Sequence, residues 1–126
     1  MGTLSYIEIE KRITELRSRT IEVALYTSLI SKDVMGTEAT IPGYVRAIIN
    51  LSAGVLILGV GKRTSNTNTL NFGTSSSISP ITVTHFAWVD TSDSSIIQAA
   101  PLEYNYIWNP LHPLSVAPGL MGLLIQ

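Results

Sequence analysis

The chain has 126 residues, a net charge of −1 and no cysteine, and 45% of its residues are apolar. This length predicts one domain spanning residues 1–126. The lack of cysteine excludes disulfides and thiolate metal sites, and the balanced charge favours neither nucleic acid as a partner nor an acidic tail. Only 13% of the residues are charged, against about 25% in an average globular protein. Because a weakly charged surface resists association poorly, we expect partners to cover much of it.

No segment of the sequence is typical of a signal peptide or a membrane span. The first residues carry charges where a signal peptide needs an apolar core. The longest apolar run, at residues 51–61, is shorter than the roughly 20 residues that a membrane-spanning helix needs. We therefore expect a protein that is neither secreted nor inserted in a membrane.

Residues 1–19 are predicted to form an N-terminal helix. Ser5 or Thr3 can cap it, and Glu8 follows Ser5 by three positions, as in a capping box. Apolar side chains repeat on one helical face at Ile9, Ile13 and Leu16.

The body of the chain, residues 20–126, carries the patterns of short strands. Strands are predicted at residues 21–28, 44–51, 55–61 and 80–90, with one or two within 96–108 and a last one at 119–126. Residues 62–69 are predicted to be a polar loop. About seven or eight strands with frequent turn signals indicate a mainly β fold. We expect an antiparallel β-sandwich or jelly-roll-like domain, preceded by the one helix.

The sequence contains no convincing catalytic or metal-binding pattern. The only histidines, His85 and His112, stand at unrelated positions and do not form a metal-ligand set. Asp90 and Asp93 lie in a turn, where aspartate usually bonds to the nearby backbone. We therefore expect no enzymatic activity, no cofactor and no metal.

Two apolar segments are candidates for contact with partners. Tyr104, Tyr106 and Trp108 alternate along one strand and are expected to share one of its faces. Such a row of rings suits core packing or a protein interface, and a carbohydrate ligand remains a weaker alternative. Nucleic acid is not expected, because lysine and arginine are missing nearby. The second segment is the apolar run at Val55, Leu56, Ile57 and Leu58.

Four short motifs give the sequence a resemblance to a known family. They are ALYT at residues 24–27, GTE at 36–38, GYVR at 43–46 and VTHF at 83–86. With their order and the strands between them, residues 21–126 resemble a widespread family of small bacteriophage virion proteins, often labelled tail-fibre-like.

The resemblance implies a structural role for the loop between the second and third motifs. Gly36 and Gly43 would allow turns with positive φ on either side of this loop. Glu38 and Arg46 are expected to pair and to hold the loop against the sheet. The alternative is an ordinary surface salt bridge worth less than about 1 kcal/mol.

The resemblance also implies a structural protein of the virion, made in the host cytoplasm. We expect a capsid cement or decoration protein, self-associated as a homodimer or homotrimer and bound to the major capsid protein on the capsid surface. The alternative is a small structural or receptor-contacting protein of the tail or fibre. A carbohydrate-binding module and a small hydrolase are further classes, and no residue set supports the hydrolase.

Overall fold

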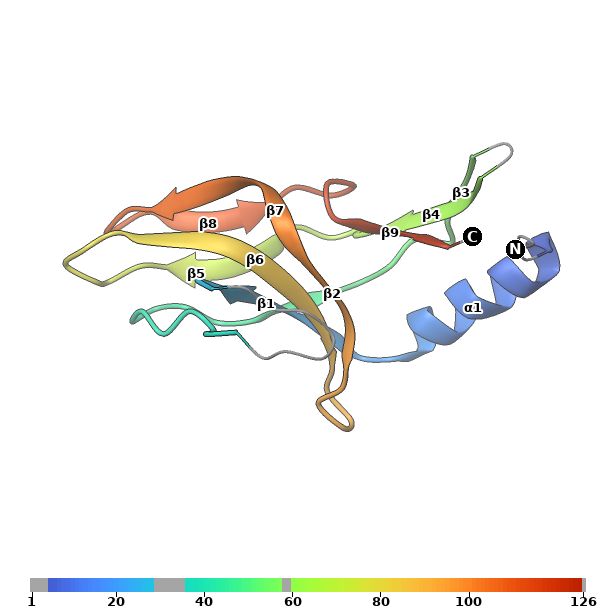
Figure 1. Cartoon of the computed structure of the whole chain (residues 1–126), viewed down its shortest axis with the longest axis horizontal. Coiled ribbons are helices and arrows are strands. Elements are labelled where there is room, and N and C mark those ends of the chain that lie inside the picture. The colour runs from blue at the N-terminus through green and yellow to red at the C-terminus, as the bar shows by residue number, and fades with distance from the viewer. Residues whose placement is uncertain (1–4, 29–35, 58–59, 126) are drawn as a thin grey trace. The chain divides into compact units, whose positions relative to one another are not determined.

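The computed structural model describes residues 5–28, 36–57 and 60–125 (Figure 1). Contacts within the chain group it into two compact units. The helix unit is formed by the chain up to residue 20, by residues 49–70 and by the chain from residue 116. The sheet unit is formed by residues 21–48 and 71–115. The N-terminal helix precedes the strands in the chain, as predicted, and is grouped with residues 49–70 and the chain from residue 116. Whether the chain folds as one domain stays a prediction.

The helix α1 (Tyr6–Ser18) has the predicted start and the predicted buried face. Ser5 is its N-cap, and the Ser5 hydroxyl accepts a hydrogen bond from the Glu8 backbone N–H at 3.3 Å. Ile9 and Ile13 are buried, and the helix contacts strands β4 and β9 of the same unit. In the described part of the chain, no helix is long and apolar enough to cross a membrane.

The helix unit contains a three-stranded sheet that lies against α1 (Figure 1). Its strands are β3 (Val55–Ile57), β4 (Gly61–Ser65) and β9 (Gly122–Ile125), in the order β3-β4-β9. Both pairings are antiparallel. The chain turns between the first two strands, where the Val60 N–H donates to the Ile57 carbonyl at 3.0 Å.

The predicted polar loop at residues 62–69 is wrong over its first half, because Lys62 to Ser65 belong to β4, the central strand. These polar residues are tolerated because the side chains of Lys62, Arg63 and Thr64 find partners. The buried Thr64 hydroxyl donates to the Ser52 carbonyl at 2.7 Å, and the Lys62 ammonium donates to Glu10 of α1 at 2.8 Å. The aliphatic stem of a lysine can cover apolar surface while its charged end stays at the edge. The predicted strand at 55–61 is accordingly divided between β3 and the start of β4.

A buried asparagine, Asn66, ties the end of β4 to the C-terminal segment. Its side-chain amide donates to the carbonyls of Asn68 and Ala117 at 2.8 and 3.0 Å. Its side-chain carbonyl accepts from the Met121 N–H at 3.0 Å. A buried amide satisfied in this way does not incur the cost of an unpaired polar group.

The sheet unit holds most of two antiparallel sheets, and the chain is mainly β as predicted. The larger has the order β2-β1-β6-β7 and the smaller pairs β5 with β8. Their bounds are β1 (Ile21–Tyr26), β2 (Ala47–Ile49), β5 (Leu70–Thr74), β6 (Ile81–Asp90), β7 (Ile96–Trp108) and β8 (Pro113–Val116). β1 pairs with β6, and β6 with β7, both antiparallel.

The core of the sheet unit covers both faces of β1. Successive residues 23–26 are all buried, which a strand with one solvated face would not show. Tyr26 packs with Ala24, Ala87 and Val89 in one cluster. This burial on two faces agrees with the sandwich-like arrangement expected from the sequence.

The predicted strand at 44–51 is too long, because β2 begins only at Ala47. Before it, the chain turns at Gly43, whose φ of 92° confirms the prediction for that glycine. The Val45 N–H then donates to the Phe72 carbonyl at 3.1 Å, next to β5. The positive φ predicted at Gly36 stays a prediction.

Two glycines let the backbone cross closely at this turn. Gly73 also has a positive φ, of 94°. A Cβ atom at Gly43 would lie 2.0 Å from the Thr74 carbonyl oxygen, and one at Gly73 would lie 2.0 Å from the Gly43 carbonyl oxygen. Only residues without a Cβ atom fit this crossing.

A large bulge interrupts the pairing of β6 with β7. Val83 lies opposite Tyr106, whereas His85 lies opposite Pro101. Thr84 alone therefore faces residues 102–105 of β7. Such bulges redirect side chains and break the alternation of a strand.

Candidate functional site

In residues 5–28, 36–57 and 60–125, no three His, Cys, Asp or Glu side chains are placed to hold a metal ion. The two histidines have local partners. The Nδ1 atom of His85 lies 2.7 Å from the hydroxyl of Thr84. The Nδ1 atom of His112 lies 2.9 Å from the carbonyl oxygen of Pro110.

The family motifs meet at a polar cluster centred on Glu38. The chain around Glu38 runs beside the end of β1, where the Ala39 N–H donates to the Leu25 carbonyl at 2.9 Å. The Glu38 carboxylate accepts two hydrogen bonds from Arg46, from Nε to Oε2 and from Nη2 to Oε1, both at 2.8 Å. The structure thus brings the two residues of the predicted loop pair together in a bidentate ion pair.

Tyr44 is a third member of this cluster. Its hydroxyl donates to Glu38 Oε2 at 2.6 Å and accepts from the Leu25 N–H at 3.0 Å. Its ring stands edge-on to Trp108, with centroids 6.3 Å apart and planes at 83°. Tyr44 therefore links the ion pair to the end of β1 and to the core.

Glu22 lies at the outer side of the cluster. Its carboxylate is 3.7 Å from Arg46 Nη1, so one guanidinium faces two acidic groups. The Arg46 and Glu38 side chains are 34% and 27% exposed. The pair is thus neither a fully solvated surface bridge nor a buried one, and its stabilisation lies between those limits.

The cluster shifts the pKa values of its members in directions set by burial and by pairing. Burial alone would raise the pKa of Glu38, but hydrogen bonds from Arg46 and Tyr44 and the positive charge of Arg46 hold it below its ordinary value of 4.5. The pKa of Tyr44 is raised by burial and by its bond to Glu38. The bond to Glu38 also raises the pKa of Arg46. All three groups therefore keep their usual charges at neutral pH, which suits a cluster that holds a loop in place.

Sequence reasoning missed Tyr44 and Glu22. A signal for Tyr44 was present, because Tyr44 and Arg46 are two positions apart and an extended segment puts such residues on one side. For Glu22 no local signal was available, because it reaches Arg46 only through the fold.

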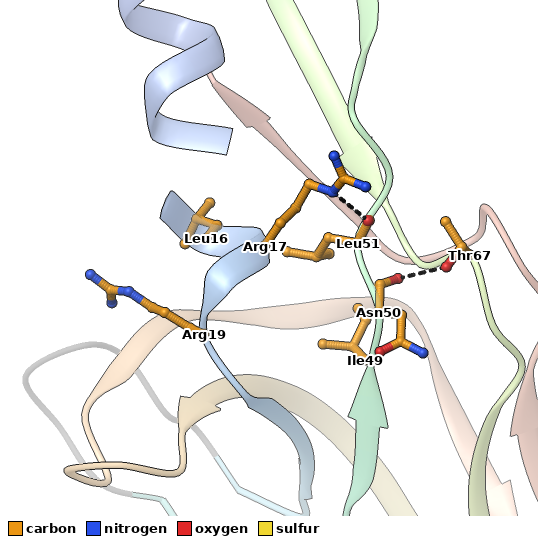
Figure 2. Close-up of a pocket in the computed structure, with 7 residues that line it drawn as sticks. All are labelled: Leu16, Arg17, Arg19, Ile49, Asn50, Leu51 and Thr67. Atoms are coloured by element: carbon orange, nitrogen blue, oxygen red, sulfur yellow. Dashed lines mark hydrogen bonds between the residues drawn. The ribbon is translucent and has the colours of Figure 1, made fainter. Parts of the chain in front are cut away.

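An open pocket of about 300 Å³ lies in the helix unit beside the end of α1 (Figure 2). Arg17 and Arg19 line it and would suit an anion if they converged. Arg17 Nε instead donates to the Leu51 carbonyl at 3.1 Å, and Arg19 pairs with Glu15 at 2.5 Å. Figure 2 shows the two guanidinium groups pointing in different directions. We assign no ligand to this pocket.

The predicted contact segment at residues 55–58 lies on the surface over its described residues. Val55, Leu56 and Ile57 form β3, and all three are exposed. Leu58, predicted with them, lies outside the described residues. These side chains are available to a partner.

The predicted contact segment at Tyr104, Tyr106 and Trp108 is divided between the surface and the core. Tyr104 is 79% exposed and Tyr106 is also exposed, whereas Trp108 is fully buried. The indole N–H of Trp108 donates to the His112 carbonyl at 2.7 Å. Trp108 is therefore a core residue and not an interface residue. Tyr106 and Trp108 both lie beyond the bulge and pair regularly with β6, so alternation along the strand does not distinguish the buried ring from the exposed one.

Comparison with known proteins agrees with the resemblance seen in the sequence. No curated protein matches the chain. The model of one protein family, described as podophage GP4 fiber I protein gp80, matches residues 12–100, which is more than half of the chain. This match confirms the resemblance to small phage virion proteins and supports a structural role in the virion. The chain belongs to the podophage GP4 fiber I protein gp80 family.

Proposed function

We propose that this protein is a structural component of a podophage fibre, acting through contacts with other proteins of the virion. The observation that carries the proposal is the match of residues 12–100 to a family described as a fiber protein. The fibre alternative drawn from the sequence fits this description better than the capsid cement that we expected first.

The exposed surface supports a role in protein contact. Large apolar side chains are exposed in both units, among them Ile7, Val55 and Leu120 in the helix unit and Tyr104, Ile107 and Leu111 in the sheet unit. Exposed apolar surface of this kind marks contact sites when it gathers in patches. The Glu38 cluster is not proposed as a contact site. It holds in place the loop that contains the motifs at residues 36–38 and 43–46.

The cement hypothesis remains as the second candidate. It rests on the small size of the chain and on its low content of charged residues, 13%. A partner on the capsid lattice would be the major capsid protein, and that partner is still a prediction.

The number of copies per virion separates the two functions. We would purify virions and measure the protein by quantitative mass spectrometry against the major capsid protein. A fibre component should be present in at most about a few dozen copies, set by the symmetry of the tail. Hundreds of copies, in near-stoichiometric ratio to the capsid protein, would reject the fibre proposal and favour cement.

Location in the particle provides an independent test. Antibodies raised against the protein and coupled to gold should label the tail end of intact virions in electron micrographs. Label spread over the head would overturn the fibre proposal. Virions lacking the protein are the control for non-specific label.

A further inference from the structure

We infer that the helix unit pairs with a second copy of this chain through the outer edge of β3, in an antiparallel arrangement about a twofold axis at Leu56. The inference concerns how copies pair. It does not depend on whether the protein lies on the fibre or on the head.

The first observation is the open edge of β3. In the sheet order β3-β4-β9, β3 is an end strand, and β4 is its single strand partner in the described part of the chain. Val55, Leu56 and Ile57 are 68%, 43% and 39% exposed. Proteins usually protect such an edge with charge, proline or a bulge. Residues 55–57 contain no charged residue and no proline, and in the described part of the chain the protection seen at this edge is the shortness of the strand.

The second observation is that one face of this sheet carries exposed apolar side chains on its two outer strands, with Arg63 between them. Leu56 lies opposite Lys62, which bonds to Glu10 of the helix, so Leu56 is on the helix side. Val55 lies opposite Arg63, and Arg63 lies opposite Leu124 of β9. Residues opposite each other in antiparallel strands share a face. Val55 and Leu124 therefore share the side away from α1, together with Ile57.

The sequence of β3 is complementary to itself. With Leu56 on the axis, Leu56 would face the partner's Leu56, and Val55 would face the partner's Ile57. Val55 and Ile57 lie on the same face, so the exposed apolar side chains of the two edge strands would join into one surface. Both helices would lie on the opposite side. A slip by one residue would place unlike faces together, which fixes the register.

The distribution of charge in the helix unit also permits a second copy to pair at the edge of β3. Residues 49–61 contain no charged residue, so no like charges meet at the axis. The nearest cations, Lys62 and Arg63, are one strand further in. The two copies of β4 would be about 14 Å apart, three strand spacings, which exceeds the screening length of about 8 Å at physiological salt.

The size of the contact suggests why pairing would occur in an assembly. Three residues of strand edge bury far less than the roughly 800 Å² per partner of a standard stable complex. Pairing of free chains should therefore be weak. In a virion, neighbouring copies are held close together, and the high effective concentration favours the same contact.

The absence of cysteine from the chain permits a direct test. Leu56→Cys would place one thiol on the axis. Opposite residues in an antiparallel pair have Cβ atoms about 4.5–5.5 Å apart, close to the spacing of a disulfide. Under mild oxidation we expect disulfide-linked dimers to form at least about tenfold faster than with Ile78→Cys, because pairing raises the effective thiol concentration. Ile78 is the matched control, since it is the most exposed of the large apolar residues described.

A second cysteine distinguishes edge pairing from stacking of the open faces. Leu124 lies on the open face but on the far strand, so Leu124→Cys should cross-link no faster than the Ile78→Cys control. Faster cross-linking at Leu124 than at Leu56 would overturn the inference. Equal rates at Leu56 and Ile78 would overturn it as well.

A charge swap tests the twofold register without relying on disulfides. Leu56→Lys and Leu56→Glu should each be monomeric in sedimentation at concentrations where the wild-type chain associates, since each puts like charges on the axis. A mixture of the two variants should associate again. A mixture that stays monomeric, with both variants folded by circular dichroism, would show that Leu56 does not face its own copy.

Discussion

Both carboxylate oxygens of Glu38 accept hydrogen bonds from the guanidinium of Arg46, at 2.8 Å each. The two residues are close in the chain, yet they belong to separate segments, one lying beside β1 and one leading into β2. Because Tyr44 also donates to Glu38 and accepts from the Leu25 N–H, the cluster joins the segment at Glu38, the segment at residues 44–46 and β1. The pair therefore holds the loop in place, and its loss should lower the stability of the sheet unit.

Glu38→Gln should destabilise the protein by about 1–3 kcal/mol, because the neutral amide leaves the half-buried guanidinium without its charged partner. Urea unfolding followed by circular dichroism measures this directly. The matched control is Glu103→Gln, which changes an exposed carboxylate and should alter stability by less than about 0.5 kcal/mol. Equal effects of the two substitutions would contradict the assigned role of Glu38.

The lowered pKa of Glu38 predicts an acid-sensitive share of the stability. The folded-state pKa lies below the ordinary 4.5, so the unfolded chain binds a proton first as the pH falls. The stabilisation is complete above about pH 4.5 and is lost as the pH falls through the folded-state pKa. The wild-type chain should therefore have a larger free energy of unfolding than Glu38→Gln above about pH 5, and this difference should disappear as the pH falls to about 2. Measuring the unfolding free energies of both proteins across this pH range tests the prediction. A difference between them that does not change with pH would contradict it.

The elements that could be predicted from the sequence have regular patterns of apolar residues. The helix stripe at Ile9 and Ile13 and the alternation through β6 each report a local period. Both elements lie where they were predicted. The N-cap at Ser5 was likewise predictable, because capping depends on residues within one turn.

The elements that were missed depend on contacts between distant residues. β4 consists largely of polar residues and shows no apolar alternation. It is a strand because Thr64 bonds to Ser52 and because both its edges are paired. The burial of Trp108 was hidden for the same reason, since its ring packs against Tyr44, which is distant in the chain. The Glu38 pair was predicted from the family resemblance and not from local pattern.

Gly43→Ala should be strongly destabilising, because the new Cβ would meet the Thr74 carbonyl oxygen at 2.0 Å and the φ of 92° is itself unfavourable. Gly119→Ala is the matched control, since Gly119 has a φ of 85° with no atom within 4 Å of the added Cβ. The control should cost about 1–2 kcal/mol from backbone strain alone. The Gly43 variant should lose clearly more in thermal unfolding. If the two variants lost the same stability, the close crossing with Gly73 and Thr74 would not be a constraint on the fold.

Tyr104 and Trp108 were grouped together by the sequence pattern, but their substitutions should have different effects on stability. Trp108→Ala removes a fully buried ring and should cost about 3–5 kcal/mol. Tyr104→Ala removes an exposed ring and should change stability by less than about 0.5 kcal/mol. A loss of binding in the Trp108 variant would therefore be confounded by unfolding, whereas the Tyr104 variant remains folded.

If the sheet unit contacts a host receptor, adsorption of phage carrying Tyr104→Ala to host cells should fall while particle yield and protein stability stay unchanged. Normal adsorption by that phage would exclude Tyr104 from receptor contact.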